Sequence, residues 1–575
     1  MEYLVRGILE EVRRLVDFGE VPPASDEERK IATYVKYKFE ETDLDQVEIF
    51  EFKSLLWYDL GSYLLANGLR ISAVALPYTL PSEVEGRLVH IGLGIDPKDW
   101  REKDLEGNIA LIQFFKEDID SAKHQYLEAV ERGAIGVIFY DFVPGGTLRR
   151  IVITGVHEYH YGPSPPPVVP VLAVSLEDGL KLREMCGRRV RLVSNSVIVP
   201  ESISMSVIGI LNGKSEEEIL ITAHHDHWLT GVGDNLIGTA ILVVLSRYLC
   251  KLDRKRSIKL ISFGSEEAGA LNFSPWYWAH GSREYVRVYK KELENVHAVL
   301  NIDILTRGSI VLYTSGPEFI SFIRNLPGIL YYSKITYDIP YFDSFTFTME
   351  GIPSLTLSTM EEYINYYHTN KDSLNRIDRT TLRRGVRILL TLIEELIVKG
   401  FEFEYSSIAD YIRAKCNGYE LRALNRLKNL LSQPEAKTLA RTLKKVLTRP
   451  YFNGDYRLDI GSFKADLVPQ LSILKDIRKV EIALELLKRG KIKEGIKEIE
   501  SIPRRRIAPG TEEELPSINV VPLVKLLESG FVDSVIRVLN VLSNTYRKSI
   551  MSIVDHLNSI LETIIVDHMS YETSN

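Results

Sequence analysis

The sequence predicts an α/β protein: a mostly parallel sheet with flanking helices, an inserted β-rich domain and a C-terminal helical domain. Two observations lead to this fold class. Between residues 201 and 400, apolar runs of strand length alternate with helical patterns, which is typical of a parallel sheet covered by helices. The flanking regions differ, because short β-like runs fill residues 56–200 and leucine and isoleucine recur at helical spacing over residues 401–575.

Residues 1–55 are predicted to be the N-terminal part of the domain that holds the parallel sheet. The first sixteen residues have helical periodicity, and they lack the uncharged apolar core of a signal peptide. Ser25 with Glu28 resembles a capping box, which predicts a second helix that runs to about Glu41. The alternating run 46–52 then predicts a strand.

Residues 56–200 are predicted to form a separate β-rich domain. Its one helix, 121–132, is expected to end at Gly133, a plausible C′ glycine. His157 and His160 have no carboxylate or cysteine at ligand spacing, so we interpret both as surface residues. The predicted strands are 88–91, 109–112, 136–140 and 170–174.

Residues 201–400 are predicted to hold the parallel sheet, and residues 401–575 are predicted to be helical. The expected strands are Ser206–Leu211, Ile219–Ala223, Ser257–Phe263, Ala298–Ile302 and Ser354–Leu357. The expected C-terminal helices include Ala423–Leu431, Ala436–Leu447, Ile477–Lys488 and Val532–Thr563. His556 and His568 lie on this amphipathic pattern, and we interpret them as surface or hydrogen-bonded histidines.

Imidazole and carboxylate side chains follow four of the predicted strands. In open α/β sheets, ligands bind beyond the carboxyl ends of the strands, so these side chains should converge on one crevice. They are also the ligand types that divalent metal ions need. The converging residues are His224, Asp234, Glu266, Glu267, Asp303 and, in a longer loop, His368.

This set of residues predicts a hydrolytic site for two divalent metal ions. His224 and Asp303 would hold one ion. His368 and Glu267 would hold the other, and Asp234 would bridge the two. Such an arrangement leaves an open position for a water molecule between the ions.

Three further residues near these ligands are given roles by their position in the chain. Glu266 and Glu267 are neighbours, so their side chains should point in different directions, which leaves Glu266 free as a general base. Asp226, two residues after His224, is expected to accept the second imidazole N–H. His225 and His227 are interpreted as an incidental polar cluster or as lining.

Composition and charge exclude several classes of partner. The formal charge is −7 and there is no long basic run, so nucleic acid is not expected as a partner. We expect no membrane-spanning helix, because no apolar run approaches the ~20 residues that such a helix needs. Cys186, Cys250 and Cys416 lie far apart, which suits a reducing cytosol and predicts a cytoplasmic protein. No nucleophile elbow or phosphate-binding loop is present.

The motifs together resemble the co-catalytic zinc exopeptidases, a family that includes bacterial and archaeal aminopeptidases, glutamate carboxypeptidase II and the transferrin receptor. The matching pieces are AHHDHW, GVGDN, FGSEEAG, NIDI and YHTNKDSLNRID, in the order of the family. The resemblance implies two divalent ions, with zinc as the expected metal. It also implies that Tyr367 donates a hydrogen bond to the tetrahedral intermediate. By resemblance, the ligands are His224, Asp234, Glu267, Asp303 and His368, with Glu266 as base and Asp226 behind the first histidine.

The resemblance extends to the flanking regions. DLEGNIALIQFF followed by AVERGAIGVIFY resembles a protease-associated domain. The helical region 401–575 occupies the place of the dimerisation domain in the glutamate carboxypeptidase and transferrin receptor branch, which implies a homodimer through this region.

The expected activity is that of an aminopeptidase acting on peptides, and three alternatives stay open. A carboxypeptidase needs cationic groups for the terminal carboxylate, and no Arg-rich patch lies between Ser315 and Asp343. A receptor-type binding protein on the same fold is disfavoured, because all five metal-ligand positions and the position of the base hold suitable residues. A glutaminyl-cyclase-like transferase uses one zinc ion rather than two. The segment Phe342-Asp343-Ser344 departs from the Ser-Asp-His of the family, so part of the pocket is expected to differ.

Overall fold

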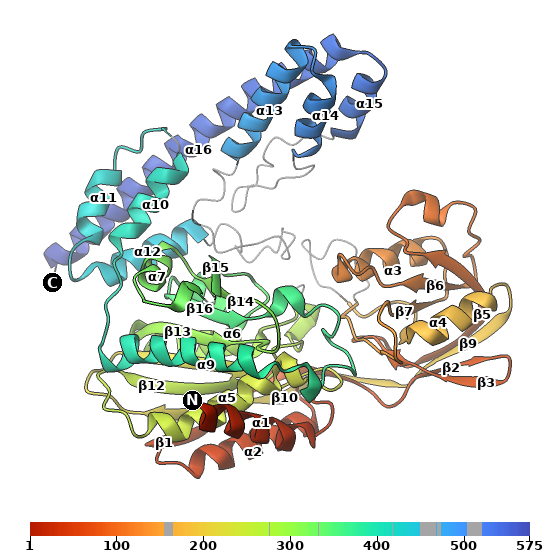
Figure 1. The fold of residues 1–575 in the computed structure, drawn as a ribbon, viewed down its shortest axis with the longest axis horizontal. Coiled ribbons are helices and arrows are strands. Elements are labelled where there is room, and N and C mark those ends of the chain that lie inside the picture. The colour runs from red at the N-terminus through yellow and green to blue at the C-terminus, as the bar shows by residue number, and fades with distance from the viewer. Residues whose placement is uncertain are drawn as a thin grey trace.

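A computed structural model of the chain consists of two eight-stranded sheets and a helical C-terminal region (Figure 1). His157 and His160 lie outside the described residues. The structure describes residues 1–153, 165–274, 276–331, 333–416, 418–448, 467, 473–502 and 520–574.

The first sheet is the mostly parallel sheet that the sequence predicts. Its central pairs, β12 with β11, β11 with β13 and β13 with β16, are parallel. The pairs β1 with β10, β10 with β12 and β14 with β16 are antiparallel. Two of its strands, β14 and β15, were not predicted. In spatial order the strands are β1 (Gln46–Asp59), β10 (Ser196–Leu211), β12 (Ser257–Phe263), β11 (Glu218–His224), β13 (Val296–Ile302), β16 (Ser354–Ser358), β14 (Ile310–Thr314) and β15 (Ser333–Tyr337).

Helices cover both faces of this sheet. Successive residues of a strand point to opposite sides, so a strand that is apolar at every position has apolar side chains to cover on both faces. In β11, Ile219 and Ile221 pack in the core formed with one set of helices, and Leu220 packs in the core on the other face. The first set is α1 (Glu2–Val16), α2 (Asp26–Glu40), α5 (Ile237–Leu249), α7 (Pro317–Arg324) and α9 (Arg379–Ile393); the second is α6 (His280–Val288) and α8 (Asp343–Met349).

Only half of the predicted capping box forms at the start of α2. The Ser25 hydroxyl accepts a hydrogen bond from the backbone N–H of Glu28 at 3.1 Å, as expected. The Glu28 side chain, however, is buried and reaches away from Ser25. Its carboxylate accepts hydrogen bonds from the Ser265 backbone N–H at 2.9 Å and from the Ser204 hydroxyl at 3.0 Å. Glu28 therefore links α2 to the loop that follows β12.

The second sheet lies between β1 and β10 in the chain, and these two strands pair antiparallel as far as Asp59 and Ser196. The helix α3 (Ala122–Glu131) is followed by Gly133 with φ +87°, which agrees with the predicted C′ glycine. The helix α4 (Leu176–Glu184) also packs on this sheet. In spatial order the strands are β3 (Leu69–Ser72), β2 (Tyr63–Ala66), β9 (Arg189–Ser194), β5 (Ser82–Gly92), β6 (Ile109–Gln113), β7 (Gly136–Tyr140), β8 (Val171–Val174) and β4 (Val74–Ala75).

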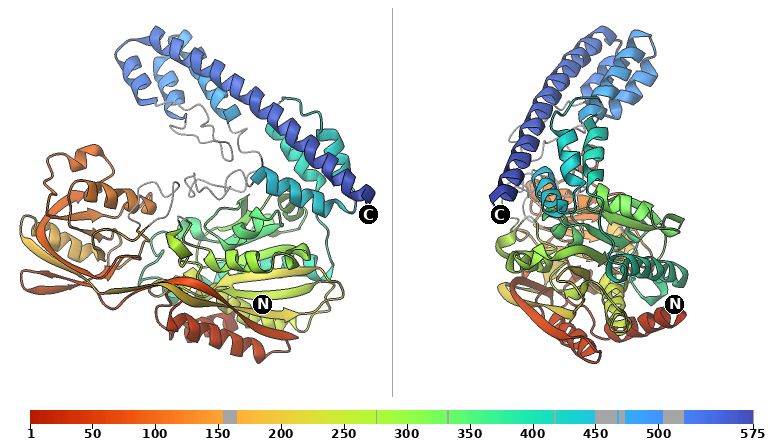
Figure 2. Two further views of the ribbon diagram at one scale, coloured as in Figure 1. Left: turned by 180° about the vertical axis from the view of Figure 1, so that it is seen from behind. Right: turned by 90° about the vertical axis from the view of Figure 1, so that its left-hand side faces the viewer.

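The C-terminal region is helical, as predicted, and one long helix runs through all of it (Figure 2). This helix, α16, contacts α11 and α12 at one end and α13 and α15 at the other. His556 is exposed and His568 is half-buried. The helices are α10 (Ser406–Cys416), α11 (Leu424–Leu431), α12 (Ala436–Thr448), α13 (Ile473–Lys488), α14 (Ile492–Glu500), α15 (Val520–Glu528) and α16 (Val532–Ser574).

Two helical segments of the described chain are long and apolar enough to cross a membrane by length and composition, where the sequence analysis expected none. Val232–Leu249 is 83% buried inside the molecule, as the core helix of a folded domain would be. Val532–Ser570 belongs to α16 and is 33% buried. Short groups of polar residues, such as Asp234-Asn235 in the first segment and Arg547-Lys548-Ser549 in the second, interrupt both apolar runs. That the chain has no membrane partner stays a prediction.

Candidate metal centre

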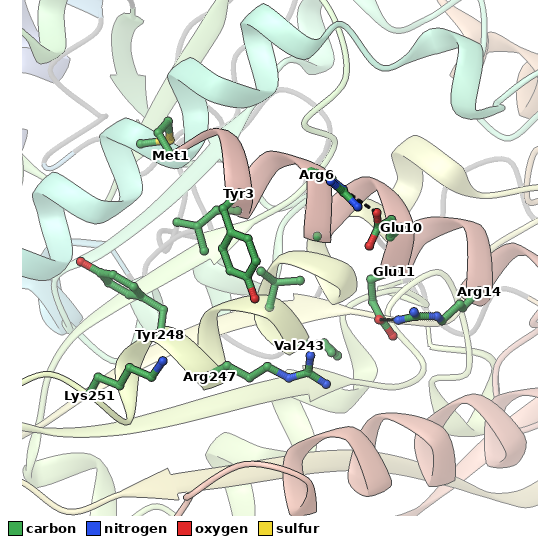
Figure 3. Close-up of a pocket in the computed structure, with 13 residues that line it drawn as sticks. Met1, Tyr3, Arg6, Glu10, Glu11, Arg14, Val243, Arg247, Tyr248 and Lys251 are labelled. Carbon is green, nitrogen blue, oxygen red and sulfur yellow. Dashed lines mark hydrogen bonds and ion pairs between the residues drawn. The ribbon is translucent and has the colours of Figure 1, made fainter.

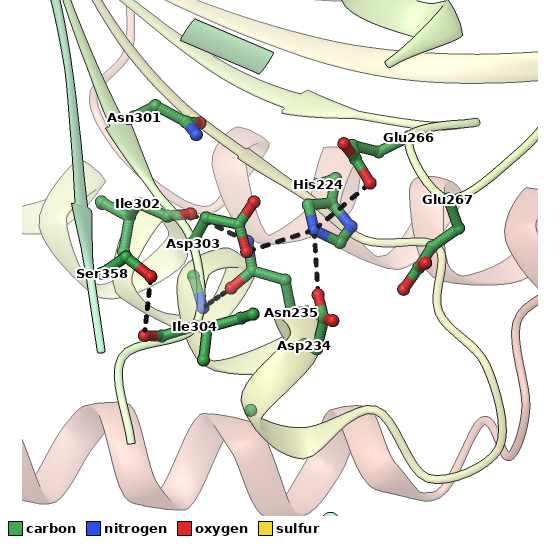
Figure 4. A network of polar contacts seen from close by, with 12 residues as sticks. His224, Asp234, Asn235, Glu266, Glu267, Asn301, Ile302, Asp303, Ile304 and Ser358 are labelled. Atoms are coloured by element: carbon green, nitrogen blue, oxygen red, sulfur yellow. Dashed lines mark hydrogen bonds and ion pairs between the residues drawn. The ribbon is translucent and has the colours of Figure 1, made fainter. Parts of the chain in front are cut away.

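The carboxyl ends of three adjacent parallel strands position the predicted ligands. His224 is the last residue of β11, Glu266 and Glu267 follow β12, and Asp303 follows β13 directly. The register places His224 opposite Phe263, so the ends of β11 and β12 are level. His224, Asp234, Glu266 and Asp303 point toward one another at this edge of the sheet (Figure 4).

The structure brings the predicted ligands together as two groups that share Asp234. His224, Asp234 and Asp303 form the first group, and Asp234, Glu267 and His368 form the second. The His224 Nε2 atom lies 3.4 Å from Asp234 Oδ1 and 3.7 Å from Asp303 Oδ1. The His368 Nε2 atom lies 3.5 Å from Asp234 Oδ2 and 2.8 Å from Glu267 Oε2.

These distances and the unsatisfied polar atoms fit a divalent ion in each group. Two ligand atoms about 2.1 Å from one zinc ion at the tetrahedral angle lie about 3.4 Å apart, close to three of the four distances. The fourth, between His368 and Glu267, has to lengthen on binding. Buried atoms without a hydrogen-bond partner normally cost free energy, so their clustering here indicates a missing ligand. They are His224 Nε2, Glu266 Oε1, Glu267 Oε1, Asp303 Oδ1 and both ring nitrogens of His368.

The electrostatics of the centre also favour a cation. Burial lowers the pKa of His368, but the Glu267 and Asp234 carboxylates outweigh this effect and raise the pKa to about 10. Burial raises the pKa of Glu267 to about 7 and that of Glu266 well above its ordinary value. Buried carboxylates with raised pKa values are destabilised as anions, and a bound cation relieves this cost.

Asp234 is presented by the loop between β11 and α5, which is fixed through its backbone. The Gly233 and Asp234 N–H groups donate to Asp372 Oδ2 at 2.7 and 3.2 Å. The Asn235 side chain donates to the Ile302 carbonyl at 2.8 Å, which ties the loop to the end of β13. Asp372 and Asn235 have no predicted role, although both lie within the motifs GVGDN and YHTNKDSLNRID.

Asp226 has a different partner from the one predicted. The His224 Nδ1 atom lies 3.0 Å from the Asp226 carbonyl oxygen and 3.9 Å from its carboxylate. The carboxylate instead accepts the backbone N–H groups of Glu266 and Glu267, both at 3.0 Å. The carboxylate is drawn to them because the turn after β12 presents two consecutive N–H groups that need acceptors. Asp226 therefore positions the two glutamates.

The loop that carries His368 holds this residue in an unusual backbone conformation. His368 has φ +54°, in the left-handed region that residues other than glycine rarely adopt. Its ring stacks on that of Tyr367, with ring centroids 3.7 Å apart. Tyr367 is half-buried, and burial together with the Glu267 and Asp234 charges raises its pKa well above the ordinary value. Its phenol therefore keeps its proton and can donate a hydrogen bond.

The remaining histidines of the cluster are structural. His225 is buried, its Nδ1 atom lies 2.9 Å from the Ser262 hydroxyl, and burial lowers its pKa to about 3, so the ring is neutral. His227 is also buried, and its two ring nitrogens lie 3.2 Å from the His225 carbonyl and 3.0 Å from the Gly19 carbonyl. Both form hydrogen bonds inside the core, so they are not an incidental polar cluster.

Asp343, in the segment that departs from the family pattern, is a buried carboxylate close to the centre. Burial raises its pKa to about 7, and its charge contributes to the raised pKa of Glu266. The sequence predicts only that this part of the pocket differs, and Asp343 has no predicted role.

A third group of possible ligands, Glu217, His297 and Glu402, lies at the opposite edge of the sheet, where β11 and β13 begin. Arg256 and Lys437 already neutralise its carboxylates: they lie 2.8 and 2.6 Å from Glu217, and Arg256 also pairs with Glu402. A divalent ion there would be repelled by two cations, so we interpret this group as an ion-pair network.

A groove of about 580 Å³ between α1 and α5 includes none of the predicted site residues (Figure 3).

Comparisons with known proteins show which family and which domain parts of the chain match. Residues 206–393 match peptidase family M28, and residues 84–182 match the PA domain. Aminopeptidase YwaD of Bacillus subtilis is 25% identical over 422 residues, which cover 68% of this chain and 84% of that protein. Carboxypeptidase Q of Xenopus laevis is 22% identical over 48% of this chain and 60% of its own length. The solved structure of a zinc aminopeptidase from Bacillus subtilis shares the fold, with a TM-score of 0.55, 21% identity and coverage of 69% of this chain and 95% of that one.

Proposed function

Because the chain carries a peptidase domain of family M28 together with a PA domain, we propose that it is a metal-dependent exopeptidase that removes residues from the amino terminus of peptides. The observation that carries the proposal is the pair of ligand groups that share Asp234 and are built from buried atoms without hydrogen-bond partners. The similarity to aminopeptidase YwaD, which covers 84% of the length of that protein, supports cleavage from the amino terminus.

The two ions would be held by the two groups of ligands, with zinc as the expected metal. His224 and Asp303 belong to one ion, His368 and Glu267 to the other, and Asp234 to both. When bound, the ions would polarise the carbonyl of the scissile bond and lower the pKa of the attacking water. Asp226 contributes by holding the backbone of the two glutamates.

Glu266 is the proposed general base. Its side chain lies at the centre without a place in either ligand group, and its Oε2 atom is 3.9 Å from His224 Nε2. It takes a proton from the attacking water as the oxygen bonds to the carbonyl carbon. It then delivers that proton to the leaving nitrogen as the C–N bond breaks. Tyr367 would donate a hydrogen bond to the oxyanion of the tetrahedral intermediate.

A carboxypeptidase is the second candidate, because the chain is also similar to carboxypeptidase Q. A carboxypeptidase has to bind a terminal carboxylate with cationic groups, whereas an aminopeptidase has to bind an ammonium with anionic ones. The acidic surroundings of the centre, which include Asp343, favour the ammonium.

The direction of cleavage can be tested by incubating the metal-loaded protein with one peptide in unblocked, N-acetylated and C-amidated forms, then measuring product masses. We expect the unblocked and C-amidated peptides to lose N-terminal residues and the N-acetylated peptide to stay intact. Shortening of the N-acetylated peptide from its C-terminus would establish the carboxypeptidase instead.

We also propose a homodimer through residues 401–575 and a cytoplasmic location. Large apolar side chains exposed on α16, including Val541 (66%) and Met551 (62%), support a further protein contact there.

Three cysteines without disulfide bonds, Cys186, Cys250 and Cys416, support a reducing compartment.

A further inference from the structure

A segment of the inserted β-rich region lies against the loop that carries His368. Residues 146–150, which follow β7, run antiparallel to residues 368–370 and form an isolated β-bridge between Arg149 and Thr369. The Arg150 N–H donates to the His368 carbonyl at 3.0 Å, and the Asn370 N–H donates to the Leu148 carbonyl at 3.2 Å. The Leu148 N–H in turn donates to the Asn370 side chain at 3.0 Å.

The Arg149 side chain extends this contact to the part of the loop that precedes His368. Its guanidinium donates to the Ile364 carbonyl at 2.9 Å, to the Tyr367 carbonyl at 2.7 Å and to the Asn365 carbonyl at 3.3 Å. On its other side it pairs with Asp141, which follows β7, at 2.8 Å. Arg149 is fully buried, and these bonds occupy the donors on all three of its nitrogens.

The loop needs such support because it has little regular structure of its own. His368 adopts a left-handed backbone conformation, and a residue in such a conformation keeps it only where its surroundings fix it. The carbonyls that Arg149 binds come from the turn directly before it. The other ligands have different support, because His224 ends β11, Asp303 follows β13, and the Asp234 loop is held by Asp372.

We propose that Arg149 is a positioning residue for one of the two metal ions. It fixes the loop so that His368 and Tyr367 face the centre, and it makes the inserted region a structural part of the His368 group. In the His224 group, His224 and Asp303 lie at strand ends of the first sheet, and Asp234, which both groups share, is held by Asp372. The proposal rests on the proposed function in taking His368 as a ligand.

The test compares Arg149→Lys with Arg150→Lys. Arg150 is the matched control, because it is the adjacent arginine and is also buried, but its guanidinium pairs with Glu20 and Asp59 rather than with the loop. Lysine keeps the charge but cannot supply a planar set of donors to three carbonyls. Zinc binding to each variant is measured against a competing chelator. We expect Arg149→Lys to weaken the binding of one of the two ions about 10- to 100-fold and that of the other to a smaller extent, and Arg150→Lys to leave both unchanged.

A second readout does not depend on metal or activity. Amide hydrogen exchange over residues 364–370 of the metal-free protein should be faster in Arg149→Lys than in the wild type and unchanged in Arg150→Lys. Unchanged exchange, or an equal weakening of both ions, would overturn the proposal, because a general loss of stability affects both ions. If Arg149→Lys does not fold, Asp141→Asn should give a smaller effect of the same kind. Wild-type protein without peptidase activity would refute the proposed function but leave the exchange result valid.

Discussion

At the scale of single residues, the centre depends on which carboxylate binds metal and which stays free. Glu266 and Glu267 are adjacent, and both backbone N–H groups are held by Asp226. The Glu267 carboxylate lies 2.8 Å from His368, whereas that of Glu266 lies 3.9 Å from His224. Holding both backbones on one carboxylate fixes the difference in direction between the two side chains.

The roles of these glutamates predict opposite effects of amide substitution. Glu266→Gln should keep both ions and lower kcat by about 10²- to 10⁴-fold, because only the proton acceptor is lost. Glu267→Gln is the matched control, and it should lower the affinity for one ion. Metal content by mass spectrometry and turnover of an unblocked peptide measure the two effects. An unchanged kcat in Glu266→Gln would remove Glu266 as the base.

The raised pKa of His368 predicts that metal affinity depends on pH. The metal-free imidazole carries a proton below its pKa of about 10, and a metal ion has to displace that proton. Affinity should therefore rise with pH below this value, by about tenfold per pH unit for each displaced proton. Calorimetry in buffers of different ionisation enthalpy, over about pH 6 to 9, measures the released protons. Binding that releases none would contradict the assignment of His368 as a ligand.

Only part of the centre could be predicted from residue types and spacing. His224, Asp234, Glu267, Asp303 and His368 were predicted to meet because each follows a strand or lies in a loop at one edge of the sheet. The predicted hydrogen-bond partner of Asp226 was wrong. Asp226 is close to His224 in sequence, but its carboxylate accepts backbone N–H groups that begin 40 residues later in the chain, at Glu266. The role of Arg149 could not be predicted, because its partners in the loop are backbone carbonyls, which any residue supplies.

At the scale of elements, the ends of strands are fixed by side chains from helices that lie far away in sequence. Glu28 of α2 is the clearest case, because it accepts the N–H of Ser265 directly before the two glutamates. Burial and the nearby Asp226 charge raise the pKa of Glu28 well above its ordinary value, which favours the protonated form of its side chain.

This protonation predicts how Glu28 tolerates substitution. Glu28→Gln should change the free energy of unfolding little, because glutamine has the shape of the neutral acid and keeps an acceptor for Ser265. Glu28→Ala should destabilise the protein by about 1–3 kcal/mol, because it leaves buried donors without an acceptor. Urea unfolding of both variants provides the comparison. Equal loss in the two variants would show that an ionised carboxylate is needed.

Burial accounts for several of the strands that were predicted and for β15, which was missed, but not for β14, which is buried at every position and was also missed. The strands β11, β13 and β16 are buried at every position, and their apolar runs stand out in the sequence. In contrast, β15 lies at the edge of the sheet and has no fully buried residue. An edge strand needs no continuous apolar run, so its sequence resembles that of a loop.

At the scale of the whole molecule, the helical region is joined to the first sheet by a buried ion pair and by hydrogen bonds as well as by apolar packing. Lys444 of α12 pairs with Glu318 of α7, and both side chains are buried. Arg256, just before β12, donates to the Leu396 and Phe401 carbonyls at 2.8 and 2.9 Å. The helices α10 to α12 are therefore held close to the sheet, whereas α16 leaves large apolar side chains exposed.

These exposed side chains predict the contact surface of the proposed homodimer. Light scattering should give twice the mass of the chain. Replacing both Val541 and Met551 by Glu should give a monomer, because a buried charge without a partner opposes association. Leu69→Glu, at an equally exposed position on β3, is the control and should leave the mass unchanged. A monomeric wild-type protein would refute the proposal.

The long antiparallel pair of β1 and β10 has a consequence for how such a chain could have evolved. Tyr58 and Val197 are register partners, so the points where the second sheet leaves and rejoins the first lie about 5 Å apart. A whole domain can be gained at such a point without disturbing the strands on either side, because a short hairpin fills the same gap. Excision of the insert at this point would leave the strands of the first sheet in place but would remove Arg149 from the loop that carries His368.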